Sequence, residues 1–423
     1  MCLTIPAKIK EIDGKEALVQ VEDMFKKVNI SLISDIKIGD WILYISNIAV
    51  KVIPQDEAEE ILELLQLPSS KIDIEKLDKE FRDIIEASKT RELKKEEIVY
   101  LLNIEGQEKE ALFSEANIVR KTTLKDFICI HGIIEFSNYC KNDCSYCGLR
   151  VKNTKLHRYR MSVDEIVETA HYAVDEKGYK LLVLQSGEDF FYTDDMLAEI
   201  IKRIKEKYKV FIFISVGERG YECYKKMKDA GASGVLFRFE TSNPKLFKTI
   251  HPSGKDLKNR FEHLKFMGEL GYYIATGSII GLPGQTIEDL ADDILVMKEK
   301  ANMVSMGPFV PCDDTPFSEE NAGDTEMNLK MIAILRLMLP TARIPVVTAL
   351  ETLVGKDGRQ RSLQAGANSL MINLTPAKYR PYYKIYPDKF YQEESVWEKY
   401  GLFKYEESYK MIEDRMADEI NKK

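Results

Sequence analysis

The chain has 423 residues, of which 44% are hydrophobic and 31% are charged, so it is expected to fold around a large core and not to be disordered. Its net charge of −8 argues against a general nucleic-acid binder, because such a protein presents a basic face to the phosphates. Apolar runs such as Val210–Ile214 are far shorter than the roughly 18 residues of a membrane span, and no export signal is visible, so we expect a cytoplasmic protein without a membrane partner.

Residues 1–65 are predicted to form a small β-barrel domain. Turn signals at Asp13-Gly14 and Gly39-Asp40 separate its short apolar stretches, which are Ala17–Val21, Val28–Leu32 and Trp41–Ile45. An acidic helix over Asp56–Leu65 follows, and Pro68 interrupts the chain just after it. Residues 66–126 are then expected to be a linker and a helical layer, because their helical spacing carries no recognisable chemistry.

Residues 127–423 are predicted to form a (β/α)8 barrel of the TIM type with a C-terminal extension, so the fold class is α/β. Short apolar runs alternate here with helical stretches of 10 to 20 residues, as in repeated βα units. The expected strands are Phe127–Phe136, Lys180–Leu184, Val210–Ser215, Gly234–Phe237, Tyr273–Ile280, Met303–Met306, Ile344–Thr348 and Ser369–Ile372. Polar residues follow the carboxyl ends of these runs, where barrel enzymes place their active sites. They include Glu135, Gln185–Glu188, Ser215, Arg238–Glu240, Gly281–Gly284 and Thr348.

A cysteine cluster directly follows the first expected strand of this barrel. Cys140, Cys144 and Cys147 have the spacing C-x3-C-x2-C, while the seven cysteines of the chain are too few for a disulfide scaffold. Three thiolates can hold three irons of a [4Fe–4S] cluster and leave the fourth iron open. A zinc site is the alternative, but it needs a fourth ligand at short spacing and only His157 follows nearby. We therefore favour the iron–sulfur cluster.

The cysteine loop, with Tyr146 before its last cysteine, resembles the radical S-adenosylmethionine (SAM) enzymes. Over about residues 90–390 the chain looks like the HydE family, the radical SAM maturases of [FeFe]-hydrogenase. The segments that carry this likeness are GIIEFSNYCKNDCSYCGLR (132–150), QSGED (185–189), FRFETSNP (237–244), GSIIGLPGQTIEDL (277–290), MGPFVPCDDTPF (306–317) and LTPAKYRPYYKIYP (374–387). The resemblance implies SAM bound to the open iron and a one-electron donor such as ferredoxin or flavodoxin.

The resemblance also implies residues for the two ligands. SAM contacts are expected from Tyr146, Ser186, Gly187, Glu188, Glu240, Arg260 and Gly281, and substrate contacts from Arg238, Thr348, Ala349, Met371, Tyr382 and Tyr383. Gly187 would let backbone approach SAM closely, although an ordinary turn is the alternative. Arg238 and Glu240, two apart on a strand, would share one face and could grip charged groups, or form an internal salt bridge. Phe239 and Val347 depart from the family pattern, which has His and Thr there.

A second resemblance covers residues 1–65. The start MCLTIPA, followed by Gly39-Asp40-Trp41, is similar to the HypC family of [NiFe]-hydrogenase maturation chaperones. In that family the cysteine beside the initiator methionine helps to carry an iron–cyanide–carbonyl group, and Cys2 occupies its place. Ile45 stands near the position where the family has a histidine, so this domain either binds an iron complex differently or acts only in docking.

These observations predict a radical SAM enzyme of hydrogenase metallocofactor maturation. Its expected substrate is an iron–cysteine–CO–CN type synthon, and its expected partners are other hydrogenase maturases and a scaffold GTPase. Two alternatives stay open, since fold alone does not fix the substrate. One is a radical SAM enzyme acting on a small organic molecule, similar to methylornithine synthase or biotin synthase, and the other is a non-catalytic iron-carrier chaperone.

Overall fold

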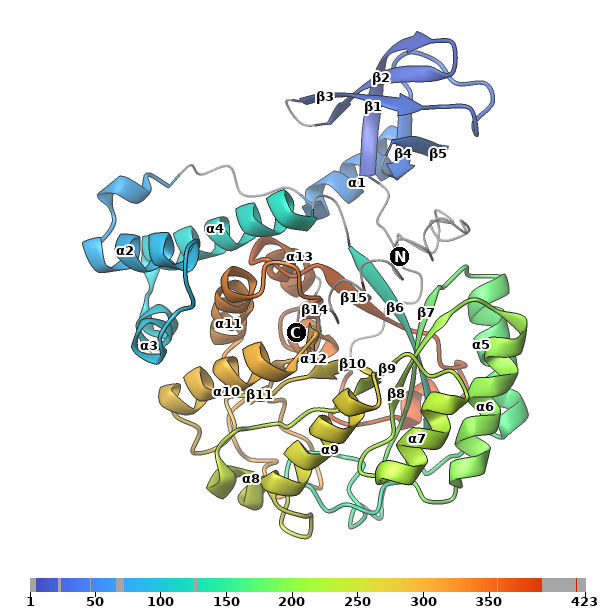
Figure 1. The fold of residues 1–423 in the computed structure, drawn as a ribbon, viewed down its shortest axis with the longest axis vertical. Coiled ribbons are helices and arrows are strands. Elements are labelled where there is room, and N and C mark those ends of the chain that lie inside the picture. Colours follow the sequence, from blue (N-terminus) through green and yellow to red (C-terminus); the bar gives the residue numbers. More distant parts are fainter. Residues whose placement is uncertain are drawn as a thin grey trace.

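A computed structural model describes residues 5–21, 24–45, 47–65, 72–124, 128–355, 357–389 and 416. Its first strands close into a small barrel with the order β1-β2-β3-β5-β4, drawn at the top of Figure 1. They are β1 (Ile5–Asp13), β2 (Glu16–Val21), β3 (Met24–Asn29), β4 (Trp41–Ile45) and β5 (Ile48–Ile53). Side chains including Ile9, Val19 and Ile42 fill the interior of this barrel without exposure. The predicted small β-barrel is confirmed.

Most of the apolar stretch Val28–Leu32 lies outside the strands, because β3 stops at Asn29. The Asn29 side-chain oxygen accepts hydrogen bonds from the backbone N–H of Ser31 at 2.9 Å and from its hydroxyl at 2.6 Å. Such a local side-chain turn competes with the strand ladder. The predicted turns at Gly14 and Gly39 do occur, and both glycines have a positive φ, of 59° and 96°.

Helices connect the small barrel to the rest of the molecule. Helix α1 (Gln55–Leu65) begins one residue before its predicted start. It is followed by η1 (Ile74–Lys76), α2 (Lys79–Ser88), α3 (Lys95–Asn103) and α4 (Gly106–Leu124), which lie along one side of the second domain in Figure 1. Phe81 and Leu112 of this layer are fully buried in the same hydrophobic core as the large sheet. The helical layer therefore packs onto the second domain.

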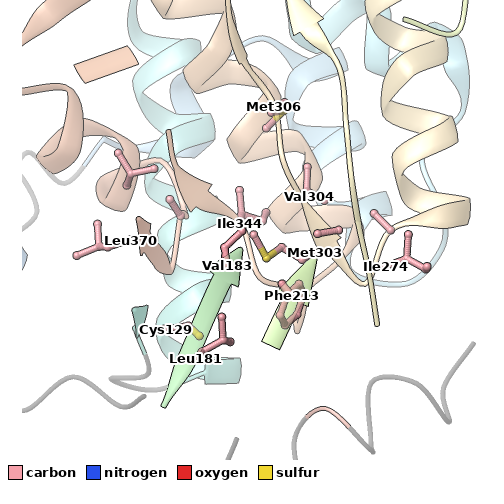
Figure 2. Packing of buried hydrophobic residues seen from close by; sticks show 14 of the residues in the cluster. Cys129, Leu181, Val183, Phe213, Ile274, Met303, Val304, Met306, Ile344 and Leu370 are labelled. Carbon is pink, nitrogen blue, oxygen red and sulfur yellow. The ribbon is translucent and has the colours of Figure 1, made fainter. Parts of the chain in front are cut away.

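The second domain is built on an eight-stranded parallel sheet with the order β12-β10-β9-β8-β7-β6-β15-β14. Its two outer strands approach each other, since Met303 and Arg343 form an isolated parallel bridge, and the sheet is nearly closed as the predicted (β/α)8 barrel requires. The strands are β6 (Cys129–Ser137), β7 (Leu181–Ser186), β8 (Phe211–Ser215), β9 (Gly234–Leu236), β10 (Tyr273–Thr276), β12 (Met303–Val304), β14 (Pro345–Val346) and β15 (Ser369–Asn373). Val183, Phe213, Met303 and Ile344 meet in its interior (Figure 2).

The single strand expected over Tyr273–Ile280 is wrong. After β10 the chain bends, and β11 (Ile279–Ile280) pairs with β13 (Gly307–Pro308) in a separate ladder. The reason is a close crossing of two backbones, because a Cβ on Gly277 would lie 2.0 Å from the carbonyl oxygen of Ser305. Because of this crossing, the chain does not continue through Gly277 as a regular strand of the sheet.

Helices surround the barrel and connect its strands. They are α5 (Val163–Asp175), α6 (Asp194–Lys207), α7 (Tyr221–Asp229), α8 (Pro244–Ile250), α9 (Leu257–Glu269), α10 (Ile287–Lys300), α11 (Thr325–Met338), α12 (Thr348–Val354), α13 (Asp357–Gln364) and the 3-10 turn η2 (Arg380–Tyr382). Side-chain caps at Ser162, Thr193, Asp256 and Thr286 start four of them. Within the described residues, none of the helices has the length and apolar character needed to cross a membrane.

Candidate active site

A cavity of about 340 Å³ opens at the carboxyl ends of the barrel strands. It brings together most of the residues singled out in the sequence. Those in its lining are Cys140, Cys144, Tyr146, Cys147, Ser186, Gly187, Glu188, Arg238, Glu240, Arg260, Thr348, Ala349, Met371 and Tyr383. They come from the loops after β6, β7 and β9, from strands β7 and β15, from helices α9 and α12 and from the residue after η2, so only the closed sheet puts them on one surface.

Gly281 and Tyr382 are outside this lining. Gly281 has a φ of 81°, and a Cβ on it would lie 2.4 Å from the Cα of Gly323. This glycine therefore serves a close approach of two backbone segments. The Tyr382 ring lies 4.2 Å from the ring of His157, and its carbonyl oxygen accepts a hydrogen bond from Asn138. The expected contacts of Gly281 with SAM and of Tyr382 with substrate stay predictions, which the cavity lining does not support.

The cysteine loop leaves β6 and runs beneath the loop that follows β7. Gly187 permits this arrangement, because a Cβ there would lie 2.2 Å from the carbonyl oxygen of Tyr139. The backbone N–H of Glu188 donates to Cys140 Sγ at 3.4 Å. Burial raises the pKa of Cys144 to about 12 and raises the pKa of Cys147 well above its usual value. Burial therefore disfavours the charged thiolates, and a bound metal cation would offset this cost.

Buried ion pairs hold the cysteine loop in place. Arg150 donates from Nε to Asp143 Oδ1 at 2.7 Å, and both side chains are buried. Arg158 donates to four backbone carbonyl oxygens of the loop and its approach, those of Asn138, Leu149, Arg150 and Asn153. The sequence analysis missed this scaffold, because charged residues in a loop normally face water. The spacing of Asp143 and Arg150 around the cysteines is the one signal that could have indicated it.

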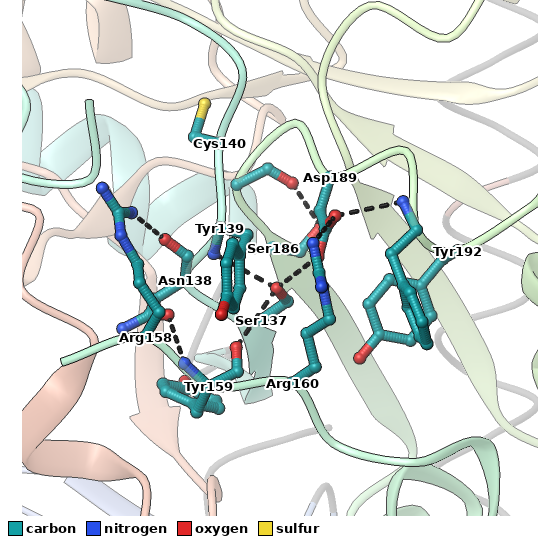
Figure 3. Close-up of polar contacts among 12 residues, drawn as sticks. Ser137, Asn138, Tyr139, Cys140, Arg158, Tyr159, Arg160, Ser186, Asp189 and Tyr192 are labelled. Atoms are coloured by element: carbon teal, nitrogen blue, oxygen red, sulfur yellow. Dashed lines mark hydrogen bonds and ion pairs between the residues drawn. The ribbon is translucent and has the colours of Figure 1, made fainter. Parts of the chain in front are cut away.

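Asp189 ties the cysteine loop to the loop after β7. Its carboxylate accepts hydrogen bonds from the Ser137 hydroxyl at 2.7 Å and from Arg160 Nε and Nη2 at 2.7 and 2.9 Å, as Figure 3 shows. Burial opposes ionisation, but these hydrogen bonds outweigh it and hold the pKa of Asp189 below its usual value. The Arg160 guanidinium also stacks 3.8 Å from the ring of Tyr139, the neighbour of Cys140.

Arg238, Glu240 and Arg260 form a charged group on the cavity wall. Arg238 Nη2 lies 2.9 Å from Glu240 Oε2, the internal salt bridge that the sequence analysis left open. Arg260 Nη1 donates to the carbonyl oxygen of Arg238 at 3.0 Å, and its Nε lies 3.0 Å from Glu218 Oε1. Yet Glu240 Oε2 and the Nε atoms of both arginines are buried without an aligned hydrogen bond. Glu240 Oε2 and Arg260 Nε are engaged in these ion pairs, whereas Arg238 Nε is in neither, so a ligand that aligns with the first two atoms has to rearrange the pairs.

The reason given for pairing Arg238 with Glu240 is wrong, although the pairing itself occurs. Strand β9 ends at Leu236, so neither residue lies on a strand. Glu240 has a φ of 68°, which is rare for a residue other than glycine. Its backbone is fixed by hydrogen bonds with Gly277 and Ile279, and this bend turns its side chain into the cavity. Strained backbone of this kind is commonly held at functional sites.

The other residues expected to contact substrate are also in the lining, apart from Tyr382, while Arg238 belongs to the charged group. Thr348 is the first residue of α12, so the expected strand Ile344–Thr348 is wrong in its end. Tyr383 is buried and its hydroxyl accepts a hydrogen bond from Gln185 Nε2 at 3.2 Å. The sequence analysis missed Lys389, which lines the cavity and forms a buried ion pair with Glu135. The two are 254 residues apart, so no local pattern could have linked them.

His251 lines the cavity beside Tyr146 and was also missed. Tyr146 Oη and His251 Nε2 are 3.2 Å apart, and the two rings meet edge to face. Burial lowers the pKa of His251 to about 3, so its imidazole is neutral at physiological pH. Within the described part of the chain, no three or more His, Cys, Asp or Glu side chains converge as ligands of a single metal ion.

Comparisons with known proteins give three family matches. Residues 134–296 match the Radical SAM superfamily, a range that contains the three cysteines of the C-x3-C-x2-C loop. Residues 1–65 match the HupF/HypC family, and residues 305–421 match the Biotin and Thiamin Synthesis associated domain.

Individual relatives cover most of the second domain. The [FeFe] hydrogenase maturase subunit HydE of Thermotoga maritima is 46% identical over 73% of this chain and 88% of its own. A 3-methylornithine synthase of Methanosarcina acetivorans is 32% identical over 73% and 86%. The crystal structure of a methylornithine synthase has a TM-score of 0.63 at 29% identity, with 69% of this chain and 85% of that one covered. The maturase HydG of Carboxydothermus hydrogenoformans, at 24% identity and a TM-score of 0.61 over 75% and 74%, shares the fold.

Proposed function

This chain belongs to the HydE family of radical SAM enzymes, and from that premise we propose that it matures a hydrogenase metallocofactor by acting on an iron–cysteine–CO–CN type synthon. The observation that carries the proposal is the shared cavity. It joins three cysteines with radical SAM spacing to a charged wall whose ion-paired atoms lack aligned hydrogen bonds.

The residues of the cavity fit a [4Fe–4S] cluster and SAM. Cys140, Cys144 and Cys147 would hold the cluster, since thiolates are its usual ligands. When bound, the cluster would supply one electron for the reductive cleavage of SAM. The buried, unaligned atoms of Glu240 and Arg260 are of opposite charge, as the amino and carboxylate groups of SAM require.

The cavity residues divide by the segments of the chain that carry them. Tyr146, Ser186, Gly187 and Glu188 come from the cysteine loop and the loop it crosses, so we assign them to SAM together with Glu240 and Arg260. Substrate contacts are assigned to Arg238, Thr348, Ala349, Met371 and Tyr383. These groups bind and orient the two ligands, and the apolar barrel interior beneath them excludes water. Gly281 and Tyr382 have no part in this assignment.

The N-terminal domain belongs to the same pathway in our proposal, as a docking or iron-carrying module. Residues 1–65 match the HupF/HypC family, although Cys2 lies outside the described residues. We further propose other hydrogenase maturases and a scaffold GTPase as partners, and ferredoxin or flavodoxin as electron donor. Reduced thiols and an oxygen-sensitive cluster fit a cytoplasmic location.

Anaerobic reconstitution followed by a SAM-cleavage assay tests the function. We expect about four irons per chain and formation of 5′-deoxyadenosine when a reductant is added. Absence of SAM cleavage in fully reconstituted protein would instead favour the iron-carrier chaperone. Turnover of lysine or dethiobiotin would favour the organic-substrate alternative, to which the methylornithine and biotin synthases at 32% and 29% identity correspond.

Replacement of Cys2 tests the role of the N-terminal domain independently of the barrel. If Cys2 transfers iron, Cys2→Ser should lower the yield of mature product in a coupled maturation assay and leave SAM cleavage alone nearly unchanged. The reason is that the large barrel has its own core and its own cysteines. Wild-type yield in the coupled assay would restrict the domain to docking.

A further inference from the structure

On the surface beside the cysteine loop, the cationic side chains are exposed and the carboxylates paired with them are buried. The ammonium of Lys141 lies 2.6 Å from Glu188 Oε1, and the two side chains are 51% and 5% exposed. Lys152 repeats this arrangement with Asp143, at 2.6 Å and with exposures of 73% and 5%. Because each carboxylate is buried under its cation, a partner approaching from solvent meets positive charge.

Arg160 adds a third cation of this kind and leads to an exposed aromatic pair. Its side chain is 33% exposed above Asp189, which is 3% exposed. The guanidinium lies 4.6 Å from the ring of Phe191, and Lys141 Nζ lies 4.3 Å from the ring of Phe190. Both phenylalanines are 53% exposed. Adjacent exposed aromatic rings under cations are typical of protein-binding surfaces.

The same surface reaches the cysteines. Arg160 stacks on Tyr139, which precedes Cys140, and Figure 3 shows these residues together. A small hollow beside them has Cys144 in its wall, together with the exposed Lys141 and Lys255. A protein seated here would therefore lie against the loop that carries the thiols.

We propose that this surface, the donor face, defined by Tyr139, Lys141, Lys152, Arg160, Phe190 and Phe191, docks a small acidic one-electron donor protein. This inference rests on the proposed function, which needs such a donor. The chain carries a net charge of −8, so an acidic protein is repelled by most of the molecule and attracted to this face. On docking, the donor is oxidised by one electron and the cluster is reduced by one, while no bond in this chain forms or breaks.

The experiment uses a variant that alters the donor face and spares the cavity. Phe190→Ser, Phe191→Ser and Lys152→Gln are combined, since none of these residues lines the cavity. Lys141 is left in place because it pairs with Glu188, and Glu188 lines the cavity. A matched control combines Tyr172→Ser with Lys177→Gln. The Tyr172 ring on α5 is also 53% exposed, and Lys177 Nζ, just after this helix, lies 6.0 Å from it. Both residues lie away from the cysteine loop.

Binding of oxidised flavodoxin to reconstituted protein is measured by calorimetry, and SAM cleavage is measured with reduced flavodoxin and, separately, with dithionite. We expect the triple variant to bind flavodoxin at least about tenfold more weakly, as for loss of aromatic contacts at an interface. Wild-type binding should weaken with added salt. Dithionite-driven cleavage should stay at the wild-type rate in both variants.

Wild-type affinity in the triple variant would overturn the proposal, as would loss of its dithionite-driven cleavage, because the face would then be part of the active site. A change in oligomeric state with unchanged flavodoxin binding would also overturn it and identify the occupant as a second copy of this chain. If wild-type protein fails to cleave SAM with dithionite, the proposed function is wrong. The flavodoxin titration still tests, independently, whether flavodoxin binds to the donor face.

Discussion

Two sets of buried arginines in this molecule differ in how much of their hydrogen-bonding capacity the chain uses. Arg336 in α11 is fully buried, and every nitrogen of its guanidinium donates. Its acceptors, at 2.7–3.2 Å, are the carbonyl oxygens of Leu339, Pro340, Ala342 and Gly366 and the side chain of Asn368. This side chain joins the end of α11 to the turn before β15 and leaves no capacity for a ligand.

Arg238 and Arg260 at the cavity are also largely buried, but each has an Nε without an aligned acceptor. Arg260 Nε is still ion-paired with Glu218, but a poorly aligned buried donor costs free energy that an aligned ligand can recover. The comparison teaches that burial and charge do not distinguish a structural arginine from a binding one. Among these three arginines, the difference lies in the alignment of the hydrogen bonds.

The largest effect is expected from the cysteines at the cavity. Cys144→Ser should abolish both cluster incorporation and SAM cleavage, because serine is a poor ligand for iron in such a cluster. Iron analysis and 5′-deoxyadenosine formation measure the two losses. Cys223→Ser is the control, since that thiol is buried in α7 far along the chain and should leave iron content unchanged. Full iron content in Cys144→Ser would remove this residue from the cluster.

Next in size is the structural arginine. Arg336→Leu leaves several buried carbonyl oxygens without donors and should destabilise the protein by on the order of 4 kcal/mol. Urea unfolding of the iron-free protein measures this, and Arg336→Lys should recover part of the loss. A change of under about 1 kcal/mol would show that these hydrogen bonds add little net stability.

Arg260→Ala should act mainly on ligand binding, with weaker SAM binding and a smaller loss of stability than Arg336→Leu, because Glu218 keeps a hydrogen bond from Asn259 at 2.8 Å. Loss of one charged partner at a buried contact costs about 2–5 kcal/mol in affinity. Equilibrium dialysis of SAM against reconstituted protein measures it, with iron content as the check that the cluster persists. Arg203→Ala, an exposed arginine on α6, serves as the control. Unchanged SAM affinity in Arg260→Ala would contradict the assignment.

The smallest effect concerns Glu326, whose carboxylate is saturated by Arg361 on α13 and by Lys109 on α4, the latter at 2.8 Å. Burial opposes its ionisation, but these cations lower its pKa to about 2. A lowered pKa adds stability above the ordinary value near 4.5 and loses it as the pH falls toward 2. Glu326→Gln should therefore cost about 1 kcal/mol at pH 7, discounted for solvent screening.

The cost of Glu326→Gln should shrink as the pH is lowered from 4.5, and urea midpoints at pH 7 and pH 3.5 measure this change. Glu269→Gln provides the comparison, because its partner Lys265 is exposed and 3.8 Å away, and no loss is expected at either pH. A cost for Glu326→Gln that does not depend on pH would point to packing and not to charge.

Local patterns predicted much of the fold. The apolar runs Val210–Ser215 and Ser369–Ile372 lie within a residue of β8 and β15, since buried parallel strands are continuously apolar. Errors occur where the chain crosses itself. Gly277 breaks an expected strand because another backbone lies 2.0 Å from its Cβ position, which no local pattern reveals.

By itself the sequence determined the two domains' fold classes and the cysteine loop, because apolar period and cysteine spacing are properties of neighbouring residues. Only the tertiary structure decided which residues share the cavity. It excludes Gly281 and Tyr382, adds His251 and Lys389, and buries the carboxylates beneath the cations of the donor face. The physical reason is that burial and ion pairing depend on segments that are distant in sequence and meet only when the barrel closes.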